Sequence, residues 1–173
     1  SYHFSVDEGY SGKHPDEEFR FLVSRLGGFG YELDLTVLTD EQIKKYRSFS
    51  DDRKAVADYI ENGDLYRLET DKRYYYAVLN VLPDRSSALF TFLQTNSQPR
   101  TECINIKIKG LNPESLYEIG DCGLKLHGRT LEKAGLKIAD LLCPHWKGDR
   151  TGGVYLKKGK AGSGVSFIIK EVK

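Results

Sequence analysis

The chain has 173 residues, and its 26 lysines and arginines against 25 aspartates and glutamates give a formal net charge of +1. The length suits one ordinary domain, or a small domain with an appendage, and excludes a complete (β/α)8 barrel, which needs about 250 residues. The balanced charge gives no electrostatic argument for nucleic acid or an anionic membrane as a partner. Because no apolar run approaches the roughly 20 residues that span a bilayer and no signal segment is visible, we expect a soluble, cytoplasmic protein.

Amino-acid usage narrows the class further. The 17 glycines and 11 tyrosines are typical of a β-rich protein, since tyrosine suits half-buried strands and glycine supplies turns. Methionine is absent even at position 1, which indicates a fragment or a processed product. Cys103, Cys122 and Cys143 are too few and too widely spaced for a disulfide framework or a zinc site. We therefore expect reduced structural thiols.

The first part of the chain has helical patterns. Residues 14–18 predict a helix start, because a proline and three acids lie where the first turn and the positive end of the helix dipole would be. Apolar residues follow at helical spacing within 19–26, and the glycines at 27–28 end the helix. Residues 29–35 then alternate well enough to predict a short strand or extended segment.

The clearest predicted helix covers 40–62. Thr39 is placed as its N-cap, and Gln42 completes a capping box, in which each residue accepts a backbone hydrogen bond from the other. Leu38 and Ile43 have the spacing of a hydrophobic staple across the same helix start. One apolar face continues from there along the helix.

From residue 64 onward the patterns are those of short strands separated by turns rich in Gly, Pro, Asn and Asp. Residues 103–109 alternate strictly between apolar and polar types, so one face should be buried and the other exposed. Spacing of roughly 8–12 residues predicts an antiparallel β-sandwich with a helical N-terminal appendage. The predicted strands are 65–69, 74–81, 88–94, 103–109, 116–119, 123–127, 153–157 and 165–171.

Catalytic and metal-binding motifs were sought next. The histidines never occur at metal-ligand spacing, and the acids around residues 7–8 and 16–18 are typical of a solvated helix start. Cys143 and His145 are a conceivable nucleophile–base pair, but residues this close in sequence rarely present both side chains to one site. We therefore predict no catalytic residue, no cofactor and no metal. The four histidines are His3, His14, His127 and His145.

Glycine-rich and aromatic segments were weighed in the same way. The glycines of 27–30, 128–130 and 152–153 lack the context of a nucleotide-binding or phosphate-binding loop and are interpreted as turns. The tyrosines at 74–76 and Trp146 are either a sugar-stacking platform or, as we favour, aromatic residues of a core-packed strand.

Four short motifs in order resemble the C-terminal region of bacterial α-galactosidases of glycoside hydrolase family 36. The resemblance covers roughly residues 20 to 173, and Glu132 departs from it where the family usually has methionine. The motifs are FGYELDL at 29–35 followed by LTDEQ at 38–42, GDLYRL at 63–68, KGLNPESLY at 109–117, and GRTLEKAGL at 128–136.

The resemblance implies that 1–63 form the end of a glycosidase barrel and 64–173 a C-terminal antiparallel β-sandwich, which packs on the barrel through the helix at 40–62. It implies a parent enzyme that hydrolyses terminal α-galactosides with retention, using two aspartates about 5–5.5 Å apart. Those aspartates lie upstream in the family, so this chain should be structural and not catalytic. The implied partner is the parent's catalytic barrel, a galactoside is bound only through the parent, and homo-oligomers are left open.

Three other functions are kept as alternatives. A carbohydrate-binding module predicts a solvent-facing aromatic row that includes Tyr74, Tyr76 or Trp146. The same region of an α-N-acetylgalactosaminidase, or of a galactosyl transferase, would look alike here, because the family's specificity loops lie on the barrel. An unrelated small hydrolase that uses Cys143 and His145 is the least favoured.

Overall fold

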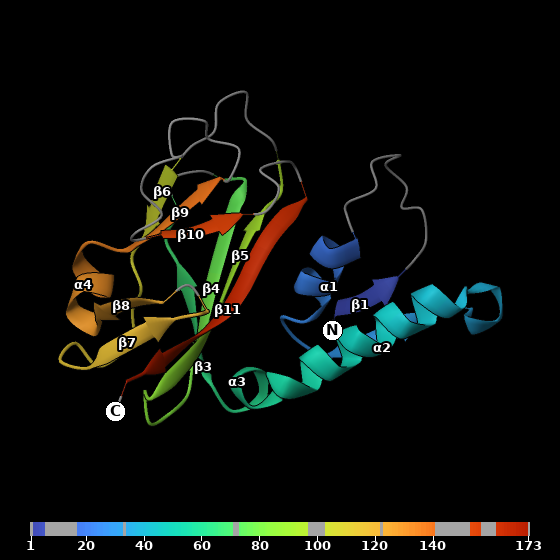
Figure 1. Cartoon of the computed structure of the whole chain (residues 1–173), viewed down its shortest axis with the longest axis horizontal. Coiled ribbons are helices and arrows are strands. Elements are labelled where there is room, and N and C mark those ends of the chain that lie inside the picture. Colours follow the sequence, from blue (N-terminus) through green and yellow to red (C-terminus); the bar gives the residue numbers. More distant parts are fainter. Residues whose placement is uncertain are drawn as a thin grey trace.

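The computed structural model describes residues 2–5, 17–32, 34–70, 73–96, 103–121, 123–140, 153–156 and 162–172. Two sheets occupy one half of the molecule, and helices with a small parallel sheet occupy the other half (Figure 1). The mainly antiparallel β-sandwich with a helical N-terminal region is therefore confirmed. None of the described helices has the length and apolar character needed to cross a membrane.

A strand–helix–strand unit opens the chain. Strands β1 (Tyr2–Ser5) and β2 (Phe29–Glu32) pair in parallel, and helix α1 (Glu17–Ser24) lies between them in the sequence. A parallel pair needs such a crossover, because the chain must return to the same end before the second strand starts. The first half of the segment predicted at 29–35 is thus a strand, whereas β1 was not predicted.

Helix α2 (Asp40–Ala55) begins at the predicted capping box. The backbone N–H of Gln42 donates to Thr39 Oγ1 at 3.3 Å, and the backbone N–H of Thr39 donates to Gln42 Oε1 at 2.9 Å. Before it lies the short 3-10 helix η1 (Leu35–Val37), which begins at the last residue of the segment predicted as extended.

The single helix predicted over 40–62 is wrong at its C-terminal end. The helix stops at Val56, whose φ of −110° leaves the helical range, and helix α3 (Ala57–Glu61) continues in another direction (Figure 1). Val56 is buried, and the hydroxyls of Tyr59 and Ser87 lie 2.8 Å apart. Packing against the sheet therefore outweighs helical continuity at this point.

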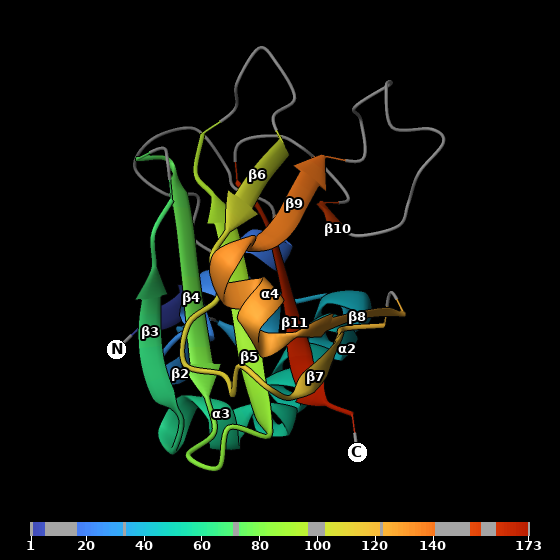
Figure 2. The ribbon, with the colours of Figure 1, turned by 90° about the vertical axis from the view of Figure 1, so that its left-hand side faces the viewer.

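The larger sheet has six antiparallel strands, and the last strand of the chain, β11, lies in its interior. β11 pairs with β5 on one side and with β7 on the other (Figure 2). In spatial order the strands are β3 (Asp64–Leu68), β4 (Tyr75–Val81), β5 (Ser87–Gln94), β11 (Ser163–Glu171), β7 (Leu116–Ile119) and β8 (Leu124–His127).

The smaller sheet covers one face of the larger one. It contains β6 (Cys103–Ile106), β9 (Leu136–Asp140) and β10 (Gly153–Leu156), and helix α4 (Gly128–Lys133) precedes β9. β9 pairs antiparallel with β6 but parallel with β10, so the sandwich is not purely antiparallel as predicted. β9 and α4 were also missed, since each is only five or six residues long.

The main core lies between these two sheets. The alternation predicted for 103–109 is confirmed where the structure describes the side chains, because Ile104, Ile106 and Ile108 are buried while the residues between them are exposed. Other large members with 2% exposure or less include Leu79, Phe90, Phe92, Tyr117, Ile119, Leu131, Leu136 and Ile138.

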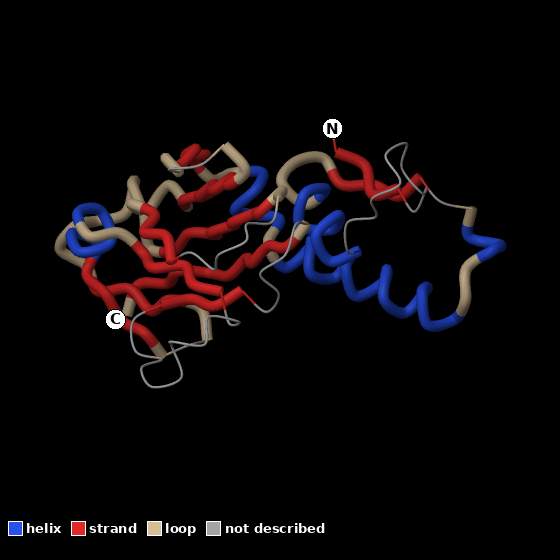
Figure 3. Tube along the Cα trace, turned by 90° about the horizontal axis from the view of Figure 1, so that it is seen from above, coloured by secondary structure: helices blue, strands red, loops and turns tan. Residues whose placement is uncertain are grey.

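Helices form a third layer on the opposite face of the six-stranded sheet (Figure 3). Every residue of β5 is buried, so both faces of this strand are covered. The buried residues on the helix-facing side of β4 and β5 include Val78, Leu89 and Leu93, which lie outside the main core cluster. Within the predicted helix at 40–62, α3 lies on β4, and α1 adds contacts with β11 and β5. A Cβ at Gly164 would lie 2.8 Å from the Phe92 carbonyl oxygen and 2.9 Å from Leu22 Cδ1, so the neighbouring strand and α1 both leave little room for a side chain there.

Candidate functional site

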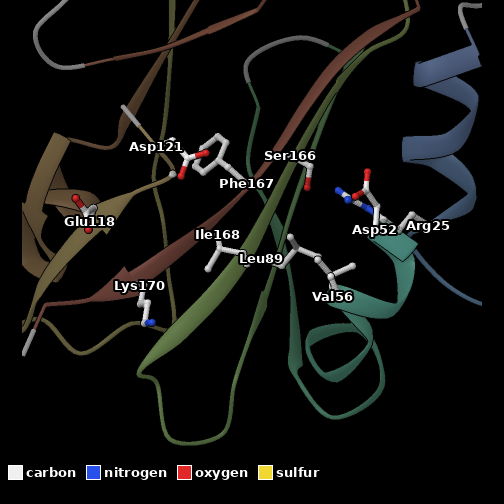
Figure 4. A pocket seen from close by; sticks show the side chains of 12 residues that line it. Arg25, Asp52, Val56, Leu89, Glu118, Asp121, Ser166, Phe167, Ile168 and Lys170 are labelled. Atoms are coloured by element: carbon white, nitrogen blue, oxygen red, sulfur yellow. The ribbon is translucent and has the colours of Figure 1, made fainter. Parts of the chain in front are cut away.

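A groove of about 490 Å³ lies between the helical layer and the outer face of the six-stranded sheet (Figure 4). The residue after α1, the last turn of α2 and the helix-facing side of β11 line it, and the β7 end of the sheet closes its far side. We call it the helix–sheet groove. It exists because α1 and α3 cover β4, β5 and part of β11 but leave β7 and β8 uncovered.

Arg25 forms one end of the groove. Its side chain is 7% exposed, its guanidinium lies 5.3 Å from the centre of the Phe21 ring, and its Nη2 has no hydrogen-bond partner among the described residues. Burial lowers the pKa of Arg25 to about 10; the Asp52 carboxylate raises it in part, and the Arg53 guanidinium lowers it. Arg25 is thus a buried cation with an unused donor.

The sheet side of the groove is polar next to β5 and apolar further along. Ser166 Oγ donates to the Phe90 carbonyl at 2.9 Å and lies 2.9 Å from Thr91 Oγ1, so its hydroxyl is already engaged. Ile168 follows on the same face and is 36% exposed. The exposed Lys170 comes next, opposite Glu118 of β7 in the strand register.

The parallel strands β1 and β2 form a second candidate region. In parallel α/β barrels the active site gathers at the carboxyl ends of the strands, which here are Ser5 and Glu32. Asp34, just beyond β2, caps η1 by accepting hydrogen bonds from the Thr36 N–H at 2.9 Å and the Thr36 hydroxyl at 2.6 Å. These bonds lower the pKa of Asp34, whose carboxylate therefore serves the turn.

An aromatic cluster holds α1 and α2 together. The rings of Phe21 and Phe49 stack with centres 4.3 Å apart, and the Tyr31 hydroxyl donates to the Tyr46 carbonyl. Burial raises the pKa of Tyr31.

Glu17, at the start of α1, has a different role from the solvated helix-start acid that the sequence suggested. Lys45 Nζ donates to Glu17 Oε2 at 2.6 Å, and the Tyr46 hydroxyl donates to Glu17 Oε1 at 3.3 Å. The bond from Lys45 lowers the pKa of Glu17, against the opposing effect of burial. Glu17 therefore ties α1 to α2.

Three of the resemblance motifs contact one another in the sandwich. Gly110 has a φ of +91° and its added Cβ would lie 2.7 Å from the Tyr66 ring, while a Cβ at Gly128 would lie 2.1 Å from the Asn112 carbonyl oxygen. The buried Tyr117 donates its hydroxyl to the Arg85 carbonyl at 2.7 Å and accepts from the Asn112 N–H at 3.1 Å. The motifs at 63–68, 109–117 and 128–136 are therefore packing motifs.

The tyrosines weighed as a sugar platform pack individually. Tyr74 is partly buried against the main core and meets the Tyr75 ring edge-on at 4.6 Å between centres. Tyr76 is half-buried, with the Arg67 guanidinium 5.5 Å from its ring centre. This geometry weighs against a shared stacking surface of these two residues.

The remaining candidates give no site in the described part of the chain. His127 is the residue before α4, and the structure describes no group of three or more His, Cys, Asp or Glu side chains that could hold a metal ion. The candidates that lie outside the described residues are Asp7, Glu8, His14, Asp16, Cys122, Cys143, His145, Gly152 and Trp146.

Sequence reasoning missed Arg25. It follows a predicted apolar face that includes Leu22 and Leu26, both of which are only half-buried, whereas Phe21, Ser24 and Arg25 are the buried residues. No local signal marks Arg25, because its burial arises from α2 and the sheet, which lie far along the chain.

The sequence matches a family model over part of its length and is similar to several α-galactosidases. Residues 75–156 match the model described as the glycosyl hydrolase family 36 C-terminal domain. The chain is 29% identical over 135 residues to the probable α-galactosidase C of Aspergillus terreus, an alignment that covers 78% of this chain and 18% of that protein. It is 28% identical over 130 residues to the α-galactosidase AgaA of Geobacillus stearothermophilus, an alignment that covers 72% of this chain and 18% of that protein.

Solved structures show the same architecture. The α-galactosidase AgaB of Geobacillus stearothermophilus matches with a TM-score of 0.75 and 26% identity, over 98% of this chain and 21% of that one. The α-galactosidase of Lactobacillus brevis matches with a TM-score of 0.79 and 20% identity, over 99% of this chain and 22% of that one. The chain thus spans about a fifth of the length of these relatives. In sequence and in fold, it resembles the C-terminal region of family 36 α-galactosidases.

Proposed function

We propose that the chain is the C-terminal region of an α-galactosidase, with residues 1–63 completing a catalytic barrel and 64–173 forming an accessory β-sandwich. The observation that carries this proposal is the unit β1–α1–β2 followed by α2. Parallel sheets occur almost only in larger α/β assemblies, with both faces covered by other elements. A lone parallel pair beside a complete sandwich is therefore expected to be part of a longer parallel sheet.

In this proposal the chain supports the enzyme and does not catalyse. Retaining glycosidases need two carboxylic acids on either side of the scissile bond, and half of such a site supplies neither correct positioning nor proton transfer. The acids near the barrel end of this chain serve other purposes: Glu17 is held by Lys45 and Tyr46, and Asp34 caps η1. We place the parent enzyme in the cytoplasm and leave its oligomeric state open.

The test compares two samples with p-nitrophenyl-α-galactoside as substrate. The 173-residue chain alone should show no turnover, and the full-length polypeptide that carries it should hydrolyse the substrate and release α-galactose first. Turnover by the isolated chain at 19.6 kDa would overturn the structural role. A folded full-length polypeptide without α-galactosidase activity would overturn the parent assignment.

Substrate specificity is tested in the same assay. The matching α-N-acetylgalactosaminide substrate separates the galactosidase from its closest alternative, and a p-nitrophenyl-β-galactoside serves as the control for anomeric selectivity.

A further inference from the structure

The first turn of α2 and the 3-10 helix before it expose two large apolar side chains. Val37 is 74% exposed and Ile43 is 44% exposed. Among the described residues only two other large hydrophobic side chains are exposed, Leu65 and Ile168. A single exposed apolar residue is ordinary on a protein surface, whereas two within the stretch 37–43 indicate a contact surface. The described part of the chain provides no cover for it.

Ile43 lies on the side of α2 that faces away from α1. α1 packs against the side that carries Lys45 and Phe49, through an ion pair of Lys45 at 2.6 Å and a stacked Phe49 ring with centres 4.3 Å apart. Successive helical residues are rotated by about 100°, so Ile43 and the exposed Arg47 are about 40° apart and at least about 120° from both α1 contacts. In Figure 1, α1 lies along one side of α2, and no other described helix or strand lies along the opposite side at its N-terminal end. We call this side, with Ile43 and Arg47, the open side of α2.

The neighbouring strand β2 has an open edge as well. Ser50 of α2 donates to the Tyr31 hydroxyl of β2 at 3.1 Å, and that hydroxyl donates to the Tyr46 carbonyl, so α2 is fixed to β2. β1 pairs with one edge of β2, and none of the described strands pairs with the other. In a parallel α/β barrel each strand is followed by a helix, and the helices form a ring outside the strands. A strand added at the free edge of β2 would therefore bring a helix to the open side of α2.

We propose that the open side of α2 is the docking surface for an amphipathic helix of the parent enzyme, which lies outside these 173 residues and covers Ile43 with apolar side chains. This inference rests on the proposed function, and it names the surface and the kind of partner at the barrel end of the chain. The chain matches only about a fifth of each relative, so a much larger polypeptide is available to supply the helix. The surface also continues two contacts that the chain already makes, those of α1 with α2 and of β1 with β2.

The test measures thiol labelling at two adjacent positions of α2, with Ile43→Cys on the open side and Lys44→Cys about 100° further round the helix. In the 173-residue chain both thiols should react with a maleimide at similar rates, because both positions are exposed. In the full-length enzyme the thiol at position 43 should react at least about tenfold more slowly, since the reagent reaches it only when the contact opens. The rate at position 44 should not change. Peptide mass spectrometry separates these sites from the native thiols of Cys103, Cys122 and Cys143.

A second readout is stability. Ile43→Ala should leave the melting temperature of the 173-residue chain within about 1 °C, because the lost side chain is exposed and alanine is the better helix former. In the full-length enzyme the same change should lower the melting temperature by about 2–4 °C, because a buried contact is lost. Leu65→Ala is the matched control, since it shortens an exposed aliphatic side chain of the sandwich and should have the same small effect in both samples.

Three results would overturn the inference. The first is equal labelling of position 43 in the two samples, and the second is protection of positions 43 and 44 alike, which would bury α2 on both sides. The third is protection that disappears when the full-length enzyme is diluted until it is monomeric, because the occupant would then be a second copy of the enzyme. Failure of the proposed function differs from all three, because the wild-type full-length polypeptide would then lack α-galactosidase activity.

Discussion

The β-sandwich and the N-terminal strand–helix region bury their apolar residues in different ways. The sandwich encloses its own core, where side chains such as Phe90, Phe92 and Tyr117 have no exposed surface. The buried residues of the N-terminal aromatic cluster are only Phe21, Tyr46 and Phe49 among those described. The first region has the core of an independent folding unit, whereas the second depends on neighbours, namely the sheet on one side and, in the proposed function, the rest of a barrel on the other.

The largest predicted effect separates these two regions. Phe90→Ala should destabilise the sandwich by about 3–5 kcal/mol, because it leaves a cavity in a fully buried site. Phe21→Ala removes a ring of similar burial from the N-terminal cluster, but it should change the main urea unfolding transition much less and instead increase hydrogen exchange in α1 and α2. Equal losses in the main transition would show that both regions unfold as one cooperative unit and would contradict the comparison.

A second prediction concerns the contact between the regions. Gly164→Ala should cost about 1–3 kcal/mol and increase hydrogen exchange in α1, because the added Cβ would lie 2.8 Å from the Phe92 carbonyl oxygen and 2.9 Å from Leu22 Cδ1. Leu22→Ala opens space on the α1 side, so the double variant should lose less than the sum of the two single changes. If the losses in the free energy of unfolding, measured by chemical denaturation, were strictly additive, Leu22 of α1 would not be in contact with the methyl group added at position 164.

The smallest effect lies within the N-terminal region. Glu17→Gln weakens the ion pair with Lys45 and should cost about 0.2–1 kcal/mol, since the pair is partly exposed. The pKa of Glu17 is lower in the folded chain than its ordinary value of 4.5, so its contribution is fully present above that pH and is lost as the pH falls through the folded value. Wild type and variant should therefore converge in acid unfolding curves. In a Lys45→Gln background, used as the control, Glu17→Gln should cost less at neutral pH, because only the weaker interactions with Tyr46 and Arg20 remain.

Local chemistry made parts of the fold predictable. The capping box of Thr39 and Gln42 and the alternation around Ile104 and Ile106 depend on residues a few positions apart, and both are found in the structure. β1 and the helix break at Val56 were not predicted, because they depend on pairing with β2 and on packing against the sheet. Such contacts leave no short-range pattern.

The candidate groove could not be predicted for the same reason. Arg25, Asp52 and Ser166 come from three distant segments, and nothing around any of them in the sequence signals a shared environment. The resemblance motifs were easier to find, since they mark tight internal packing, as at Gly110 and Gly128. The sequence therefore predicted the packing of the scaffold more readily than the helix–sheet groove.

The central position of β11 has a consequence for how the sheet is completed. Among the described strands, β5 and β7 are joined only through β11, which follows every other strand of this sheet in the chain. During synthesis, before β11 leaves the ribosome, the sheet can form only as two separate parts, a three-stranded β3–β4–β5 meander and a β7–β8 hairpin. The edges of β5 and β7 that later pair with β11 are then unpaired. A premature stop before residue 163 would thus remove the middle of the sheet and expose two edges open to aggregation.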